Sequence, residues 1–243
     1  MIPEDHPRYR SLVTRERLAE YARSGIVSWE GLTAHGRGEA FDYLIGEITT
    51  VSALQAERAA AALLIAAHRP VISVNGNTAA LAAGEIAALQ KASGAIVEVN
   101  LFHRTEERVR QIEDLLRNTG CDVFSGTAEQ LLPLSHDRAW CRREGMYSAD
   151  VVLVPLEDGD RCEALVQMGK IVIAIDLNPL SRTARSATLT IVDELTRALP
   201  HITKACSEIS SDECWQLTGS ADNHYLLSEA IREITMRLSH AMD

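Results

Sequence analysis

Apolar residues along the chain fall into two patterns, short continuous runs and longer stretches with helical spacing. The short runs predict strands at 70–74, 95–99, 121–124, 150–154, 170–175 and 188–192. The longer stretches predict helices at 11–24, 52–68, 78–92, 104–118, 159–168, 193–206 and 222–240. Strand and helix alternate, and the strands are apolar at consecutive positions, as in parallel sheets covered on both faces. The pattern predicts a three-layer, Rossmann-like α/β domain with a mostly parallel sheet, an N-terminal helix and a C-terminal helical tail.

Two segments fall outside this alternation. Residues 35–47 place Arg37 between Gly36 and Gly38, where a bare backbone lets a ligand approach and the guanidinium can grip a phosphate or carboxylate. We expect a functional loop there. Residues 207–219 have the composition of a linker, which divides the chain into an α/β domain over 1–206 and an acidic linker with a final helix over 207–243.

Composition and charge narrow the possible classes of protein. The net charge is −10 over 243 residues, which argues against nucleic acid as a partner. From 207 to 243 there are seven acidic residues and two arginines, so half of the excess lies in the tail. No run of eighteen apolar residues and no signal peptide is present, which predicts a cytoplasmic protein with no membrane span. The five cysteines have no CxxC spacing and predict neither disulfides nor a zinc site.

Polar residues follow each predicted strand, at the sheet edge where α/β proteins bind ligands. Asn75-Gly76-Asn77 follows the first strand and is equally compatible with an ordinary turn. After the second strand, Asn100, His103 and Arg104 precede a helix start, which Thr105 is expected to cap. The later strands lead to two further groups, Glu157, Asp158 and Asp160, and then Asp176, Leu177, Asn178, Ser181, Arg182 and Thr183.

These two later groups carry different expectations. The three acids around Gly159 form either a solvated helix start or a site for Mg²⁺ or a substrate amine. Asp176 stands where nucleotide-binding sheets hold a ribose hydroxyl, and Arg182 and its neighbours suit phosphate oxygens. Neither GxxxxGK[ST] nor GxGxxG occurs, so a nucleotide would bind without either common loop. The remaining histidines belong to no recognisable constellation and are expected mostly at the surface: His6, His68, His136, His201, His224 and His240.

Several long blocks resemble one known family. They are HPRYxSLxxRE at 6–16, AHGRGEAFDYLIGE at 34–47, SVNGNxAAL at 73–81, NLFxRTEERV at 100–109, VVLVPLEDGDRCEALVQMGK at 151–170 and DLNPLSRTA at 176–184. Over residues 3–206 the chain resembles the archaeal 4-phosphopantoate–β-alanine ligase family, also called phosphopantothenate synthetase. The resemblance does not cover the tail.

The resemblance implies an AMP-forming ligase and a homodimer. Its members join 4-phosphopantoate to β-alanine with ATP, a step toward coenzyme A, and a carboxylate activated as an acyl-adenylate fits that chemistry. By resemblance, the residues that contact ATP are Arg15, Arg37, Asp176, Leu177, Asn178, Arg182, Thr183, Asp193 and Glu194. The family often has Asp-Asn where this chain has Asp193-Glu194, so we expect a backbone contact at that turn.

Placement at strand ends, rather than the resemblance, predicts the other ligand contacts. For phosphopantoate we expect Asn75, Asn77, Asn100, His103 and Arg104, and for β-alanine or Mg²⁺ we expect Glu157, Asp158 and Asp160. The catalytic groups are expected to be Arg37, His35, Asn77 and Arg104. Two other hypotheses remain at this point. One is a sugar-phosphate isomerase or nucleotide-dependent oxidoreductase, and the other is a non-catalytic nucleotide-binding module that acts through the acidic tail.

Overall fold

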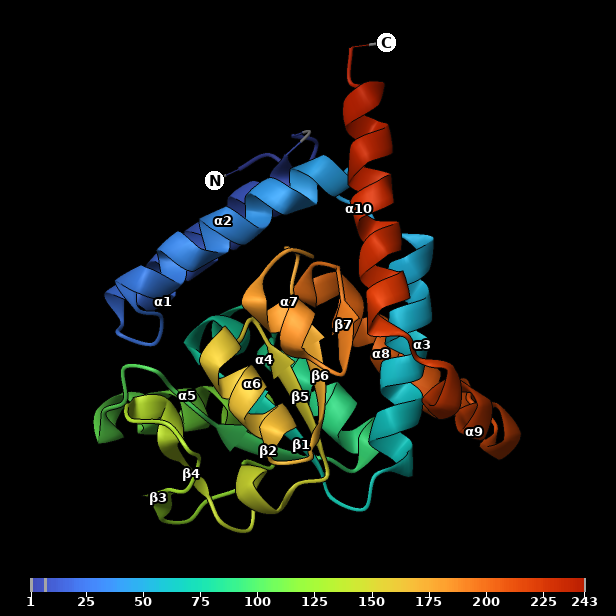
Figure 1. Cartoon of the computed structure of the whole chain (residues 1–243). Coiled ribbons are helices and arrows are strands. Elements are labelled where there is room, and N and C mark those ends of the chain that lie inside the picture. Colours follow the sequence, from blue (N-terminus) through green and yellow to red (C-terminus); the bar gives the residue numbers. More distant parts are fainter. Residues whose placement is uncertain (1, 7, 243) are drawn as a thin grey trace.

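The computed structural model describes residues 2–6 and 8–242 and is built around one parallel sheet (Figure 1). The strand order is β2-β1-β5-β6-β7, so the chain crosses from one side of β1 to the other between β2 and β5. The strands are β1 (Pro70–Val74), β2 (Ile96–Val99), β5 (Val151–Pro155), β6 (Ile171–Ile175) and β7 (Leu189–Ile191). The predicted α/β architecture is confirmed.

Both faces of the sheet are buried, which explains the continuous apolar runs. Along β1, Ile72 and Val74 face one hydrophobic cluster while Val71 faces another, and β6 alternates in the same way. The larger cluster lies under α3 (Val51–Ala66), α4 (Gly76–Ser93), α5 (Glu106–Asn118) and α8 (Leu195–Glu208). The smaller cluster lies under α6 (Gly159–Gln167).

Alanine lets the helices of the larger layer pack closely. α3 and α4 each contact α8 along much of their length. Ala60, Ala61 and Ala62 in α3 and Ala80 and Ala82 in α4 are completely buried. Small side chains favour helix formation and allow short distances between helix axes.

The predicted functional loop at 35–47 is wrong, because most of it is helical. α1 (Tyr9–Arg23) is followed by α2 (Trp29–Ile45), and together they form an arm across the sheet edge (Figure 1). Ser28 caps α2 by accepting the backbone N–H of Gly31, and Gly46 ends the helix at φ 93°. The two internal glycines, Gly36 and Gly38, disfavour helix, but they do not interrupt α2 between its two end signals.

The predicted linker at 207–219 is wrong in the same way. Ser210 caps α9 (Ser211–Ser220), which packs against α3 through an ion pair between Arg58 and Glu213. The predicted final helix is confirmed as α10 (Asn223–Ser239), which contacts α2, α3 and β7 and then extends beyond the body of the protein (Figure 1). The stretch after 206 is therefore docked onto the domain.

Three smaller features also differ from expectation. The predicted strand at 121–124 makes only a single bridge, between Val97 and Val123. Beyond it, β3 (Ala128–Gln130) and β4 (Trp140–Arg142) form a small antiparallel pair, and the short helices η1 (Asp137–Ala139), η2 (Met146–Ser148) and α7 (Arg182–Ser186) complete the chain. The cap of α8 is Glu194 rather than Asp193. Among the described residues, no helix has the length and hydropathy required to cross a membrane.

Candidate functional site

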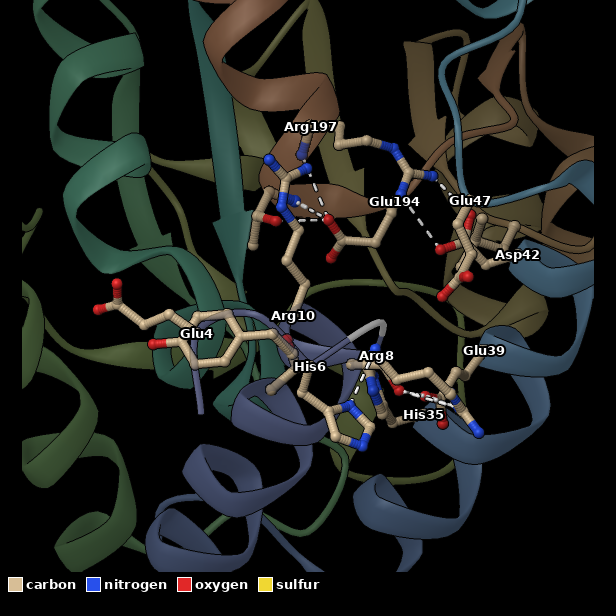
Figure 2. A pocket seen from close by; sticks show the side chains of 15 residues that line it. Glu4, His6, Arg8, Arg10, His35, Glu39, Asp42, Glu47, Glu194 and Arg197 are labelled. Carbon is tan, nitrogen blue, oxygen red and sulfur yellow. Dashed lines mark hydrogen bonds and ion pairs between the residues drawn. The ribbon is translucent and has the colours of Figure 1, made fainter. Parts of the chain in front are cut away.

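A partly enclosed cavity lies between the N-terminal segment, α2 and the start of α8, with a volume of about 410 Å³ (Figure 2). Its walls carry both cationic and acidic side chains. The lining residues are Glu4, His6, Arg8, Tyr9, Arg10, Ser11, Thr14, His35, Glu39, Asp42, Glu47, Leu177, Glu194, Thr196 and Arg197. Three of the predicted site residues, His35, Leu177 and Glu194, are among them.

Ion pairs fix the α2 wall of this cavity. The Nε of Arg15 donates to both carboxylate oxygens of Glu39 at 3.0 Å. Arg197 forms a second link, because its guanidinium bonds Asp42 of α2 at 2.5 Å and Asp193 at 2.7 Å. The arm is therefore held to the sheet domain by charge pairs that also shape the cavity.

The loop after β6, which is predicted to bind ATP, lies on the same side of the protein as this cavity and contributes Leu177 to its wall. Helix α2 approaches the loop after β6 closely at Gly38, where an added Cβ would lie 3.8 Å from Leu177 Cδ1. The loop folds on itself, since Asp176 accepts the backbone N–H of Asn178 at 2.9 Å and Asn178 accepts that of Leu180 at 2.9 Å. The family blocks at 34–47 and 176–184 thus meet in space.

Arg37 and the α7 residues lie at the margin of this region. The Arg37 side chain is exposed on α2, is not part of the cavity wall, and has no partner among the residues that the structure describes. Arg182 is also exposed and bonds Asp160 at 2.7 Å, whereas Thr183 is buried and donates to the Glu157 carbonyl at 2.9 Å. Neither arginine is buried.

The predicted phosphopantoate residues gather along the carboxyl edge of β1 and β2. Asn75 caps α4 and donates to the carbonyls of Pro155 and Leu156. Asn77 donates to the Gly31 carbonyl at 2.8 Å, which ties α4 to α2. The amide oxygen of Asn100 is buried and has no hydrogen-bond partner in the described structure. The amides therefore brace the loops, and Asn100 retains one free acceptor.

His103 and Arg104 stand at the outer end of this edge. The His103 Nε2 lies 3.7 Å from Glu30 of α2, and the side chain is half exposed. The backbone N–H of Arg104 donates to Asp137, and its guanidinium lies 3.4 Å from Glu106. Thr105 caps α5 as expected, by accepting the N–H of Arg108.

The acids at 157–160 are balanced by arginines. Asp158 and Asp160 pair with Arg138 at 2.7 and 3.2 Å, and partly buried Glu157 pairs with buried Arg161 at 3.1 Å. Asp158 also caps α6. Because each carboxylate already faces a guanidinium, the group does not form an unbalanced cation site in this arrangement.

Burial shifts the proton affinity of three site residues. It raises the pKa values of Asp176 and Glu194, although hydrogen bonds from Ser181 and Thr196 oppose the shift. Burial lowers the pKa of His35, which favours a neutral imidazole.

Sequence reasoning missed most of the cavity wall. The early arginines and the block at 6–16 were the available signal, but the N-terminal segment reaches the cavity only because the α1–α2 arm folds back over the sheet edge. Two histidines expected at the surface also have specific surroundings. His6 lines the cavity, and His201 bonds buried Glu57 at 2.9 Å.

Comparison with known proteins identifies the family. A family model described as phosphopantothenate/pantothenate synthetase matches residues 52–237. A 4-phosphopantoate–β-alanine ligase of Methanospirillum hungatei is 61% identical over the whole of both chains. Proteins of the same name from Methanosarcina mazei and Thermococcus kodakarensis are 55% and 49% identical, over 98% of this chain and 95% and 94% of theirs. The chain therefore belongs to the phosphopantothenate/pantothenate synthetase family.

Proposed function

We propose that this protein condenses 4-phosphopantoate with β-alanine to give 4′-phosphopantothenate on the route to coenzyme A, with ATP as the energy source. The observation that carries the proposal is the full-length similarity to ligases of that name, at 48–61% identity. The structure supports it with a cavity whose wall includes Arg8, Arg10 and Arg197 among acidic residues, next to a polar sheet edge. Two anionic substrates need such surroundings.

The proposed reaction has two chemical steps. A carboxylate oxygen of 4-phosphopantoate attacks the α-phosphorus of ATP, diphosphate leaves, and an acyl-adenylate forms. The uncharged amine of β-alanine then attacks the acyl carbon, and AMP leaves with the carboxylate oxygen as the amine loses a proton. Both steps require charge neutralisation at phosphate, which the predicted arginine contacts would provide.

Residue roles follow the two regions of the site. For ATP we propose the loop at 176–178, the exposed Arg37 and Arg182, and the 193–194 turn beside Arg15 and the cavity. For 4-phosphopantoate we propose the sheet edge at Asn75, Asn77, Asn100, His103 and Arg104. Arg182 bonds Asp160, so it links the proposed ATP region to the acidic group at 157–160.

Mg²⁺ fits this proposal as the partner of the ATP phosphates. Magnesium in nucleotide sites keeps several waters and phosphate oxygens as ligands. The carboxylates at 157–160 already pair with arginines, so they do not offer it a ready protein cage. An ammonium group needs only hydrogen-bond acceptors, and Asp158 and Asp160 are about one-third exposed and keep lone pairs free beside Arg138. We propose that this acidic group receives the ammonium end of β-alanine. A homodimer and a cytoplasmic location complete the proposal.

Isotope transfer tests the reaction and its intermediate together. The purified protein is incubated with ATP, Mg²⁺, β-alanine and 4-phosphopantoate carrying ¹⁸O in its carboxylate, and the products are measured by mass spectrometry. We expect phosphopantothenate, diphosphate and AMP that contains ¹⁸O. ADP together with ¹⁸O-labelled phosphate would refute the acyl-adenylate, because an acyl-phosphate passes the carboxylate oxygen to phosphate, and the absence of phosphopantothenate would refute the function.

An arginine substitution tests the site assignment. Arg37→Ala should slow turnover by at least about tenfold with an unchanged melting temperature, because Arg37 is exposed and has no structural partner in the described chain. The matched control is Arg232→Ala on α10, which is also exposed and is not among the residues that line the cavity. Wild-type turnover of Arg37→Ala would remove this residue from the site.

A further inference from the structure

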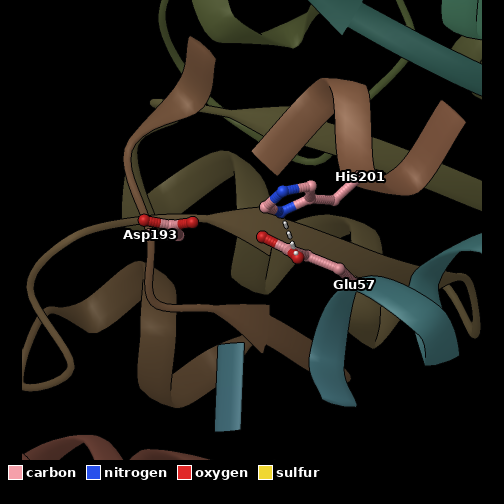
Figure 3. Close-up of side chains that lie close together, drawn as sticks. All are labelled: Glu57, Asp193 and His201. Atoms are coloured by element: carbon pink, nitrogen blue, oxygen red, sulfur yellow. Dashed lines mark hydrogen bonds and ion pairs between the residues drawn. The ribbon is translucent and has the colours of Figure 1, made fainter. Parts of the chain in front are cut away.

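Three potential metal ligands, Glu57, Asp193 and His201, lie close together beside the turn that borders the cavity. Of the three, Asp193 alone belongs to the residues proposed above to contact ATP. Glu57 comes from α3, Asp193 from the turn after β7, and His201 from α8 (Figure 3). One ligand atom from each lies within 4.8 Å of the other two. The Nδ1 of His201 lies 2.9 Å from Glu57 Oε2. Segments far apart in sequence thus place one nitrogen and two carboxylates around a common point.

One oxygen of this cluster lacks a partner. Glu57 is 1% exposed, and its Oε1 makes no hydrogen bond in the described structure. Asp193 is equally buried. A buried carboxylate oxygen without a donor is costly and uncommon, and it indicates a missing cation or proton.

The charge of the cluster supports the same reading. Arg197 sits on the far side of Asp193, bonding Oδ1, while Thr49 donates to Oδ2 at 2.6 Å. Among the described residues, Glu57 pairs with His201 and has no arginine partner. Two buried carboxylates of this cluster therefore face a single guanidinium, that of Arg197.

We propose that Glu57, Asp193 and His201 form a binding site for a first-row divalent cation such as Zn²⁺ or Mn²⁺. Bonds of about 2.0–2.2 Å separate neighbouring ligand atoms by about 3.0–3.5 Å, close to the spacing already present between Glu57 and His201. An imidazole with two carboxylates suits these ions, whereas Mg²⁺ prefers oxygen alone. The half-exposed ring of His201 gives the ion a route from solvent.

Such an ion would stabilise the turn that borders the cavity. Asp193 also accepts the backbone N–H of Glu194 and the guanidinium of Arg197, which reaches Asp42 on α2. A metal on the other side of the same carboxylate would join α3, α8 and this turn at one point. The ion has a positioning role, separate from the Mg²⁺ carried by ATP.

Metal titration of the full chain tests the proposal. Protein freed of metal with a chelator is titrated with ZnCl₂ and separately with MnCl₂ in 5 mM MgCl₂, and the bound metal is counted by mass spectrometry after dialysis. We expect one Zn²⁺ or Mn²⁺ per chain despite the excess of Mg²⁺, and a melting temperature raised by several degrees. Glu57→Gln and His201→Gln should each weaken binding by at least about tenfold.

Two comparisons keep the result interpretable. Gln keeps the size of Glu57, and each variant is checked for native circular dichroism before titration. His224→Gln, which removes an exposed histidine on α10, should bind like the wild type. Equal binding by all four proteins would assign the metal to the surface and overturn the site. No binding of either ion, with Glu57→Gln as stable as or more stable than the wild type, would show that the carboxylates share a proton instead.

Discussion

Arg197 joins the helical arm to the sheet domain, and its removal gives a direct test of that connection. Its guanidinium bonds Asp42 through two nitrogens, at 2.5 and 3.2 Å, and Asp193 at 2.7 and 2.9 Å. The Asp193 side chain is 0% exposed and that of Asp42 is 10% exposed. The substitution Arg197→Met keeps much of the side-chain length but leaves two buried carboxylates without their cation.

The expected cost follows from this burial. Removing one partner of a buried ion pair destabilises proteins by about 3–5 kcal/mol, because the other charge remains desolvated. For a chain of this size each kcal/mol lowers the melting temperature by about 2–4 °C, so we expect a fall of about 6–20 °C. Asp42→Asn should cost less, about 1–2 kcal/mol, since Arg197 keeps its bonds to Asp193.

Urea unfolding followed by circular dichroism measures both variants and their combination. The double variant Arg197→Met/Asp42→Asn should cost less than the sum of the single changes, because the two groups contact each other. Arg232→Met serves as the control. Arg232 is 75% exposed and pairs only with Glu229 of its own helix, so its loss should stay within about 0.5 kcal/mol.

Two outcomes would refute this reasoning. A loss below about 1 kcal/mol in Arg197→Met would mean that the two carboxylates are solvated or protonated in the protein. Strict additivity of the double variant would mean that Arg197 and Asp42 do not interact. In either case the arm would be held by apolar contacts rather than by this charge cluster.

Four further tests address other parts of the structure. Gly145→Ala places a Cβ 1.9 Å from the buried Glu98 carboxylate and should destabilise by about 3 kcal/mol or prevent folding. Gly84→Ala, in open space on α4, should stabilise by up to about 1 kcal/mol in the same urea assay. Burial lowers the pKa of His35, so the folded state binds fewer protons than the unfolded state, and this part of the stability is lost as the pH falls below 6.5. The substitution His35→Gln should therefore reduce the loss of stability between pH 7 and pH 5. An unchanged loss would show that His35 does not cause this pH dependence. Burial raises the pKa of Cys162 to about 12, so its alkylation at pH 8, followed by peptide mass spectrometry, should require unfolding.

Local sequence signals predicted the elements that depend on neighbours along the chain. The apolar runs placed the five sheet strands to within one or two residues, because a strand buried on both faces is apolar at most positions. The Thr105 cap was also correct, since the hydroxyl and the helix N–H that it accepts are three residues apart. Signals for α2 and α9 were present at Ser28 and Ser210 but were outweighed by glycine and polar composition.

The sequence by itself also determined the family, because long blocks of residues carry that information without any fold. Only the tertiary structure decided which side chains share a site. The cavity joins Arg8 to Arg197, and the cluster beneath it joins Glu57 to His201, across separations that no local pattern reports. Helix docking sets these distances through side-chain packing between distant segments. The same packing decides whether a carboxylate is solvated, paired or left with an unpartnered oxygen, and so decides its chemistry.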